Sequence, residues 1–155
     1  MGQTTQRDNR QAGFFQSLKN QPIKKFNFIG QDGLIWNSAK LKGKVIVINF
    51  WFTACKPCIL EMPHLNKLVE ENKNNPVVFI APAPEDKARI KKFLAKYSFD
   101  YYIIPSSLEY ITSLKVENFP THLIIDKAGI IKQVFIGYAD DIKEKLQAEI
   151  DKLIK

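Results

Sequence analysis

Residues 45–69, VIVINFWFTACKPCILEMPHLNKLV, contain both cysteines of this 155-residue chain and decide its fold. The stretch opens with Val45–Phe52, an apolar run rich in β-branched side chains, which is typical of a strand covered on both faces. Cys55 and Cys58 follow, three positions apart. Apolar residues then recur at helical spacing, so the sequence predicts a buried strand that leads through the cysteines into a helix.

The cysteine pair could bind a metal, staple the fold or perform redox chemistry. Two cysteines are too few for a disulfide-stapled scaffold, and a structural zinc site needs about four ligands. His64 and His122 could complete such a site, but they do not form the second close-spaced pair of a zinc ribbon. A Cys-x-x-Cys motif at a strand-to-helix junction in an α/β pattern instead favours thiol-disulfide chemistry.

The position of Cys55 at the start of a helix favours its thiolate form. Backbone N–H groups there lack helical partners, the helix dipole is positive, and Lys56 adds a positive charge. Pro57 suits the first helical turn because its missing N–H is not needed there. One turn of helix brings Cys58 within disulfide distance, about 5.5 Å between Cα atoms. We therefore expect Cys55 to attack a partner and Cys58 to resolve the mixed disulfide.

The rest of the chain alternates between strand and helix patterns. Two short apolar segments around a Gly/Asp turn predict a β-hairpin at residues 26–36, and two further strands around residues 127–129 predict a closing antiparallel hairpin. Single strands are predicted at 77–81 and 101–104, and helices at 85–97, 108–114 and 140–155.

This order of elements predicts an α/β fold with a central mixed sheet flanked by helices. A length of 155 residues suits one domain with one core. We expect a flexible N-terminal tail over residues 1–21, with a short helix near Phe14–Leu18, and a single domain over residues 22–155.

Composition and charge exclude several classes of protein. The net charge of +7 comes from scattered lysines with acids between them, whereas a nucleic-acid footprint needs a basic stripe, so no nucleic-acid partner is expected. No apolar run approaches the roughly 20 residues of a membrane span. The polar start of the chain has no apolar signal core, so we expect either a cytoplasmic protein or one whose signal peptide or anchor has been removed.

The stretch around the cysteines resembles the active-site segment of the thioredoxin superfamily, and specifically of its TlpA/ResA-like thiol-disulfide oxidoreductases. Residues 26–44, FNFIGQDGLIWNSAKLKGK, resemble the N-terminal β-hairpin of that group. Residues 82–105 resemble the helix and strand that the group inserts into the thioredoxin core. Residues 116–131, VENFPTHLIIDKAGII, resemble its segment with a cis-proline, which would be Pro120. The resemblance covers residues 22–155 and implies a thioredoxin-like fold.

The resemblance also implies roles for individual residues. Cys55 would be the nucleophile and Cys58 the resolving cysteine, with the reversible disulfide between them as the redox centre and no other cofactor. The implied partners are protein thiols and disulfides and an upstream thiol electron donor, and the implied form is a monomer. The residues that would bind the partner chain are Phe119, Pro120, Lys56 and Pro57.

Glu61 matches an acid of the group and would be a third catalytic residue, which accepts the proton of Cys58 three positions before it. The alternative is a solvated helix carboxylate. Asn49 falls where ordinary thioredoxins have a buried acid, and an amide cannot take a proton at neutral pH, which favours Glu61. Two residues depart from the group: Ala54 stands where Trp is common, and His122 stands where an apolar residue or Thr is usual.

Three functions follow from these residues. The resemblance implies an enzyme of the bacterial cell envelope or periplasm that exchanges disulfides with proteins, typically as a reductase that keeps apocytochrome or other cysteines reduced. The alternative is a copper-binding chaperone that uses Cys55, Cys58 and His122, since two thiolates and an imidazole suit a soft metal. A thiol peroxidase on the same fold is the least favoured, because Phe52 stands where such sites carry Thr.

Overall fold

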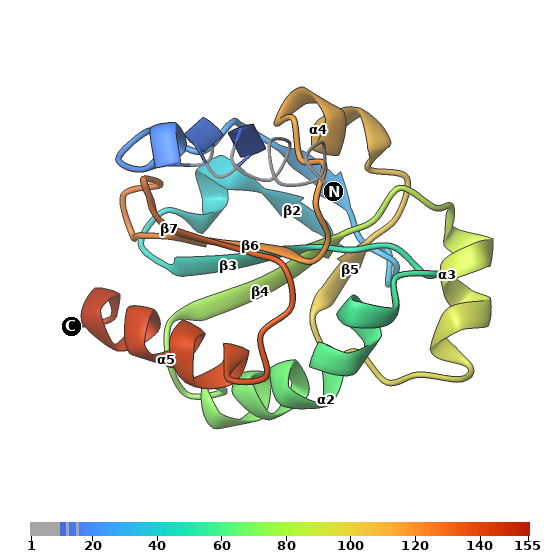
Figure 1. The fold of residues 1–155 in the computed structure, drawn as a ribbon. Helices are drawn as coiled ribbons and strands as arrows, with labels where there is room; N and C mark the ends of the chain where they lie inside the picture. Colours follow the sequence, from blue (N-terminus) through green and yellow to red (C-terminus); the bar gives the residue numbers. More distant parts are fainter. Residues whose placement is uncertain (1–9, 12, 15) are drawn as a thin grey trace.

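The fold is built on a five-stranded mixed sheet (Figure 1). The structure is a computed structural model, and it describes residues 10–155 except residues 12 and 15. Its strands are β3 (Val45–Phe50), β4 (Val77–Pro82), β5 (Tyr102–Ile104), β6 (Thr121–Ile125) and β7 (Ile131–Ile136). The strand order is β5-β4-β3-β6-β7, with β3 parallel to β4 and antiparallel to β6. The predicted central mixed sheet is confirmed.

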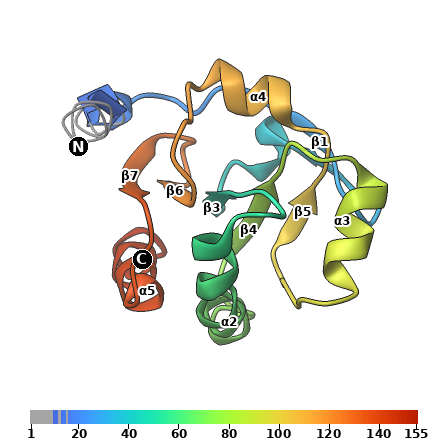
Figure 2. The same cartoon turned by 45° about the vertical axis from the view of Figure 1, so that its right-hand side comes forward.

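Helices and a hairpin cover the two faces of this sheet. The remaining elements are β1 (Asn27–Ile29), β2 (Ile35–Asn37), η1 (Ser38–Leu41), α2 (Lys56–Glu71), α3 (Lys87–Leu94), α4 (Leu108–Ser113) and α5 (Ile142–Leu153). In Figures 1 and 2, α2 and α5 lie together on one face, whereas α4 and the β1–β2 hairpin lie on the other. The predicted helices and hairpins are therefore all present, with ends shifted by a few residues.

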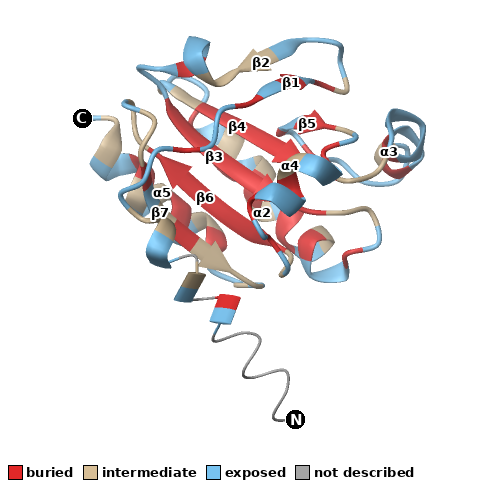
Figure 3. Cartoon of the chain, turned by 90° about the horizontal axis from the view of Figure 1, so that it is seen from above, coloured by how far each residue is buried: buried red, intermediate tan, exposed pale blue. Residues whose placement is uncertain are grey.

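Alternation along β3 builds a hydrophobic core on each face of the sheet. Val45 and Val47 point into the core that α2, α3 and α5 cover, and Ile46 and Ile48 point into the core under the hairpin and α4. Every residue of β3 is buried, as the red central strands of Figure 3 show. Burial on both faces explains why the sequence of β3 is apolar at almost every position.

The inserted segment of α3 and β5 widens the sheet and holds the N-terminal hairpin. The backbone N–H of Gln31, in the hairpin turn, donates to the carbonyl of Ile103 on β5 at 2.7 Å. The rings of Trp36 and Tyr102 pack with their centroids 4.2 Å apart. The hairpin is thus fastened to the edge strand β5.

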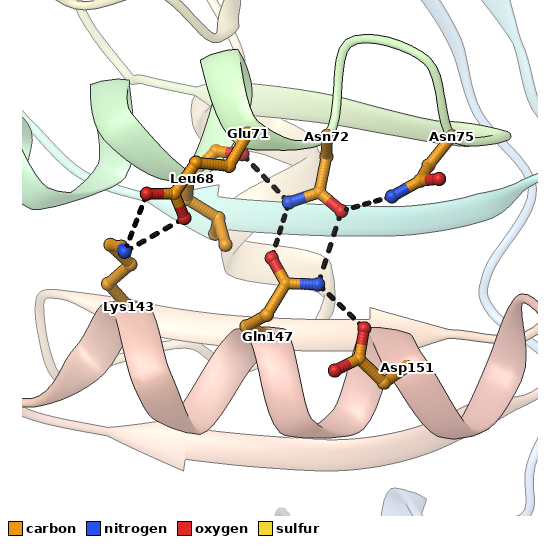
Figure 4. Close-up of polar contacts among 7 residues, drawn as sticks. All are labelled: Leu68, Glu71, Asn72, Asn75, Lys143, Gln147 and Asp151. Carbon is orange, nitrogen blue, oxygen red and sulfur yellow. Dashed lines mark hydrogen bonds and ion pairs between the residues drawn. The ribbon is translucent and has the colours of Figure 1, made fainter.

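A network of polar side chains joins the end of α2 to α5 (Figure 4). The buried Asn72 donates from Nδ2 to the carbonyl of Leu68 at 2.8 Å and to Oε1 of Gln147 at 2.6 Å. Lys143 on α5 forms an ion pair with Glu71 on α2 at 2.8 Å. These contacts fix the C-terminal end of α2, at the opposite end of the helix from the cysteines.

The N-terminal segment is described from residue 10 onward, so the division into a tail over residues 1–21 and a domain stays a prediction. Residues 16–18 are helical, within the predicted short helix. The N–H of Asn20 donates to the carbonyl of Ile131 at 2.8 Å, and the N–H of Ile131 donates to the carbonyl of Gln21 at 2.9 Å. In the part of the chain that the structure describes, no helix has the length and apolar character needed to span a membrane.

Candidate active site

Cys55 and Cys58 form a disulfide at the start of α2, with their Cα atoms 5.3 Å apart. Cys55 is the N-cap of the helix, and its Sγ accepts a hydrogen bond from the N–H of Cys58 at 3.2 Å. Both residues are buried, with exposed fractions of 3% for Cys55 and 0% for Cys58. The predicted arrangement, with one cysteine at the helix tip and the other one turn further in, is confirmed.

The residues beside the disulfide form an accessible surface. Lys56 and Pro57, which lie between the cysteines, are both exposed, as is Ala54 before them. Pro57 stands in the first turn of α2, where no backbone N–H is required. Leu60, in the next turn, is 61% exposed. A partner chain can therefore reach this end of the helix, whereas the binding roles of Lys56 and Pro57 stay predictions.

The Phe119–Pro120 peptide bond is cis, which confirms the expectation from sequence. Phe119 packs against the core cluster that contains both cysteines, and its ring meets that of Phe52 edge-on at a centroid distance of 5.3 Å. The carbonyl of Pro120 accepts from the N–H of Gly137 at 2.8 Å, which ties this turn to the end of β7. Within the described residues, the backbone groups of Phe119 make no hydrogen bond, so they are free to pair with another chain.

Glu61 is fully buried on α2, so the alternative of a solvated helix carboxylate is wrong. Its side chain lies one helical turn beyond Cys58, and side chains at this spacing are neighbours on a helix. Oε1 of Glu61 lies 2.8 Å from Nε2 of His122, and Oε2 accepts from the N–H of Ala139 at 3.0 Å. The role of Glu61 as proton acceptor stays a prediction, but its carboxyl group is buried and hydrogen-bonded, one helical turn from Cys58.

His122 is the partner of Glu61 that the sequence did not reveal. It lies on β6 directly opposite Asn49 on β3, and both side chains are buried. Among the described residues, Nδ1 of His122, both polar atoms of the Asn49 amide and the hydroxyl of Tyr101 are buried without hydrogen-bond partners. Burial, and then the charge of Glu61, raise the pKa of Tyr101 well above its usual value. These four residues form a buried polar cluster between α2 and the sheet.

Glu85 holds the loop before Cys55 and was also missed from sequence. Its Oε2 accepts from the backbone N–H of Thr53 at 2.8 Å and from the hydroxyl of Thr53 at 2.5 Å. Glu85 follows the carboxyl end of β4, and the carboxyl ends of parallel strands meet at the same edge of a sheet. That rule could have placed Glu85 beside the cysteine loop.

The copper site expected as an alternative is not formed. Among the described residues, no three His, Cys, Asp or Glu side chains gather as a metal ion requires. In the structure, Nε2 of His122 is bonded to Glu61 and the two cysteine sulfurs are joined to each other, so copper binding by the reduced protein stays a prediction. His64 is half-buried on α2 and joins no such group.

Comparison with known sequences assigns the chain to a family. The model of the redoxin family matches residues 18–150. The thiol-disulfide oxidoreductase ResA of Bacillus cereus is 34% identical over 147 residues, which are 91% of this chain and 84% of that protein. The ResA protein of Halalkalibacterium halodurans is 32% identical over 150 residues, which are 93% of this chain and 84% of that protein.

Solved structures share the same fold. A thiol:disulfide interchange protein of the thioredoxin family from Chlorobium tepidum is 23% identical, with a TM-score of 0.76 over 88% of this chain and 98% of the other. The exposed lipoprotein thioredoxin of Streptococcus pneumoniae is 19% identical, with a TM-score of 0.70 over 84% of this chain and 100% of the other. With the disulfide at the tip of α2 and the cis-proline turn, these similarities show that the chain belongs to the redoxin family and is a ResA-like thiol-disulfide oxidoreductase.

Proposed function

We propose that the enzyme reduces disulfide bonds of partner proteins in the bacterial cell envelope, with electrons from an upstream thiol donor. The observation that carries this proposal is the Cys55–Cys58 disulfide at the N-terminus of α2, flanked by exposed residues. Similarity to ResA supports the envelope setting, because TlpA/ResA-like proteins are usually exported or membrane-tethered. The pneumococcal relative, an exposed lipoprotein, supports the same setting.

The first step joins the enzyme to its partner. In the reduced enzyme, the Cys55 thiolate attacks one sulfur of the partner disulfide, so that a Cys55–partner disulfide forms and the partner S–S bond breaks. The displaced partner thiolate takes up a proton. The N-terminal N–H groups of α2 stabilise the thiolate that attacks, because they are hydrogen-bond donors without helical partners.

The second step releases the partner. Cys58 gives its proton to the Glu61 carboxylate, and the resulting thiolate attacks the sulfur of Cys55. The mixed disulfide breaks, and the second partner sulfur leaves as a thiolate that is then protonated. Two electrons have passed from the enzyme dithiol to the partner disulfide, and the enzyme ends as the Cys55–Cys58 disulfide seen in the structure. The cysteine pair carries both electrons, so the reaction needs no other cofactor.

The partner chain docks across the end of α2 and the cis-proline turn. The unbonded backbone N–H and C=O of Phe119 can pair with an extended partner segment, as a sheet edge does. Pro120 precedes β6 directly, so the docked segment would lie beside the sheet. Lys56 and Pro57 would meet the same segment from the helix side, where both are exposed. One copy of the chain supplies all of these groups.

The reduction potential of the Cys55–Cys58 couple tests the proposed direction. The protein is equilibrated with mixtures of reduced and oxidised glutathione, and the oxidised fraction is read by alkylation and mass spectrometry. A reductase is expected near the value of thioredoxin, about −270 mV, rather than near that of the oxidant DsbA, about −120 mV. The Cys58→Ser protein, which cannot form the internal disulfide, is the control. A potential close to −120 mV would contradict the reductase assignment.

A further inference from the structure

A buried hydrogen bond links the helix of the active site to the sheet beneath it. Nε2 of His122 on β6 lies 2.8 Å from Oε1 of Glu61 on α2, and both side chains have an exposed fraction of 0%. A carboxylate in such a place requires donors that replace its lost water. We propose that His122 is a positioning residue that holds the carboxyl group of Glu61 in place to accept the proton of Cys58. This inference rests on the proposed function, in which Glu61 accepts that proton.

Both oxygens of Glu61 are held by N–H donors. Ala139, in the loop between β7 and α5, donates its backbone N–H to Oε2 at 3.0 Å, and His122 lies at Oε1. Within the described part of the chain, no Lys or Arg is paired with Glu61, so these two donors take the place of a cation. A carboxylate oxygen has two acceptor positions, so each oxygen of Glu61 can still receive a proton while it keeps its hydrogen bond.

The geometry identifies the ring nitrogen of His122 that carries the proton. Only a proton on Nε2 makes the contact with the carboxylate a hydrogen bond, and in a neutral ring Nδ1 is then an acceptor. Asn49 lies opposite His122 in the β3–β6 pair, where side chains are roughly 4.5–5.5 Å apart at Cβ. Its amide lacks a partner among the described residues, as does Nδ1. The two groups are therefore not hydrogen-bonded to each other, and the Nε2–H form of the ring rests on the contact with Glu61 alone.

The other side chains around Glu61 and His122 do not compete for the proton of Cys58. Asn49, from β3, does not ionise. Tyr101, which precedes β5, keeps its own proton because burial and the charge of Glu61 raise its pKa well above the usual value. Phe135 lies opposite His122 on β7 and is apolar. Glu61 is thus the carboxylate closest along α2 to the buried sulfur of Cys58.

Two variants of His122 separate hydrogen-bond donation from mere filling of space. His122→Gln keeps an N–H at a similar reach, whereas His122→Leu keeps a similar volume without a donor. Stopped-flow mixing of each reduced variant with a protein disulfide resolves formation of the mixed disulfide from its release. We expect His122→Leu to slow release of the partner about tenfold, which is part of the hundredfold or more that a general base supplies. We expect His122→Gln to release the partner within about threefold of the rate of the unchanged protein. Formation of the mixed disulfide should be unaffected in both.

The double variant with Glu61→Gln tests whether the two residues act as one unit. If they do, Glu61→Gln with His122→Leu releases the partner no more slowly than the slower single variant, because residues of one unit are not additive. If the effects of the two single variants on the release rate multiply in the double variant, the inference is overturned. It is also overturned if His122→Gln and His122→Leu slow release equally. If the unchanged protein does not reduce the disulfide, the proposed function itself fails. If it does so and His122→Leu releases equally fast, only the role of His122 fails.

The unchanged protein gives a test that does not depend on the folding of any variant. The sequence has two histidines, His64 and His122, so ¹⁵N-histidine spectra contain two rings. We expect the ring of His122 to carry a proton on Nε2, while half-buried His64 serves as the internal reference. A proton found on Nδ1 of a neutral His122 ring would overturn the inference, because Nε2 could not then donate to Glu61.

Discussion

At the scale of single residues, Tyr101 reports on the electrostatics of the buried polar cluster. Its side chain is 4% exposed, and its hydroxyl has no hydrogen-bond partner among the described residues. Burial disfavours the phenolate, and so does the nearby charge of Glu61, so the pKa of Tyr101 is raised. The folded protein therefore holds the proton of Tyr101 more tightly than the unfolded chain does.

The raised pKa of Tyr101 predicts a loss of stability at high pH. An unfolded tyrosine loses its proton near pH 10, whereas folded Tyr101 keeps it, so the folded state binds more protons above that pH. The free energy of unfolding therefore falls as pH rises above about 10. Tyr101→Phe should make this fall shallower in denaturant titrations between about pH 8 and pH 11. Tyr102→Phe, at the exposed neighbour, is the control, and an equally steep fall in the Tyr101→Phe protein would show that Tyr101 is not the cause.

At the scale of elements, α2 is fixed at both ends, which sets the position of the cysteine pair. At its N-terminal end, Glu85 binds Thr53 in the loop that leads to Cys55. At its C-terminal end, the buried Asn72 donates to the carbonyl of Leu68 on α2 and to the side chain of Gln147 on α5, as Figure 4 shows. The disulfide can therefore open and close at the tip of a helix that is anchored elsewhere.

Replacement of Asn72 tests the contact between α2 and α5. Asn72→Ala leaves the amide of Gln147 without a buried partner and removes the donor to the carbonyl of Leu68. We expect this loss of buried hydrogen bonds to lower the free energy of unfolding by about 1–3 kcal/mol. Denaturant titration measures that change. The matched control is Asn74→Ala at an exposed position, which should change stability by less than about 0.5 kcal/mol. Equal stability of the two variants would show that the network contributes nothing.

At the scale of the whole molecule, the local patterns were predictable and the contacts between distant elements were not. The buried strand at residues 45–50 and the helix after Cys55 follow from periodicity, because each pattern is written in consecutive residues. Glu61 could be placed next to Cys58 for the same reason. Its contact with His122 could not, because that contact depends on how α2 packs on the sheet and on the register of β6 against β3. The bond between Glu85 and Thr53 joins residues 32 positions apart; the parallel-strand rule could have placed Glu85 near the cysteine loop, but not its bond to Thr53.

The central claim is that Cys55 joins the partner and Cys58 releases it. Its most direct test mixes reduced Cys58→Ser protein with a protein disulfide and reads the products by mass spectrometry under conditions that preserve disulfides. The account predicts a stable covalent adduct through Cys55, whereas the Cys55→Ser protein forms none and the unchanged protein releases a reduced partner. A stable adduct through Cys58 in the Cys55→Ser protein, with none in the Cys58→Ser protein, would contradict the account.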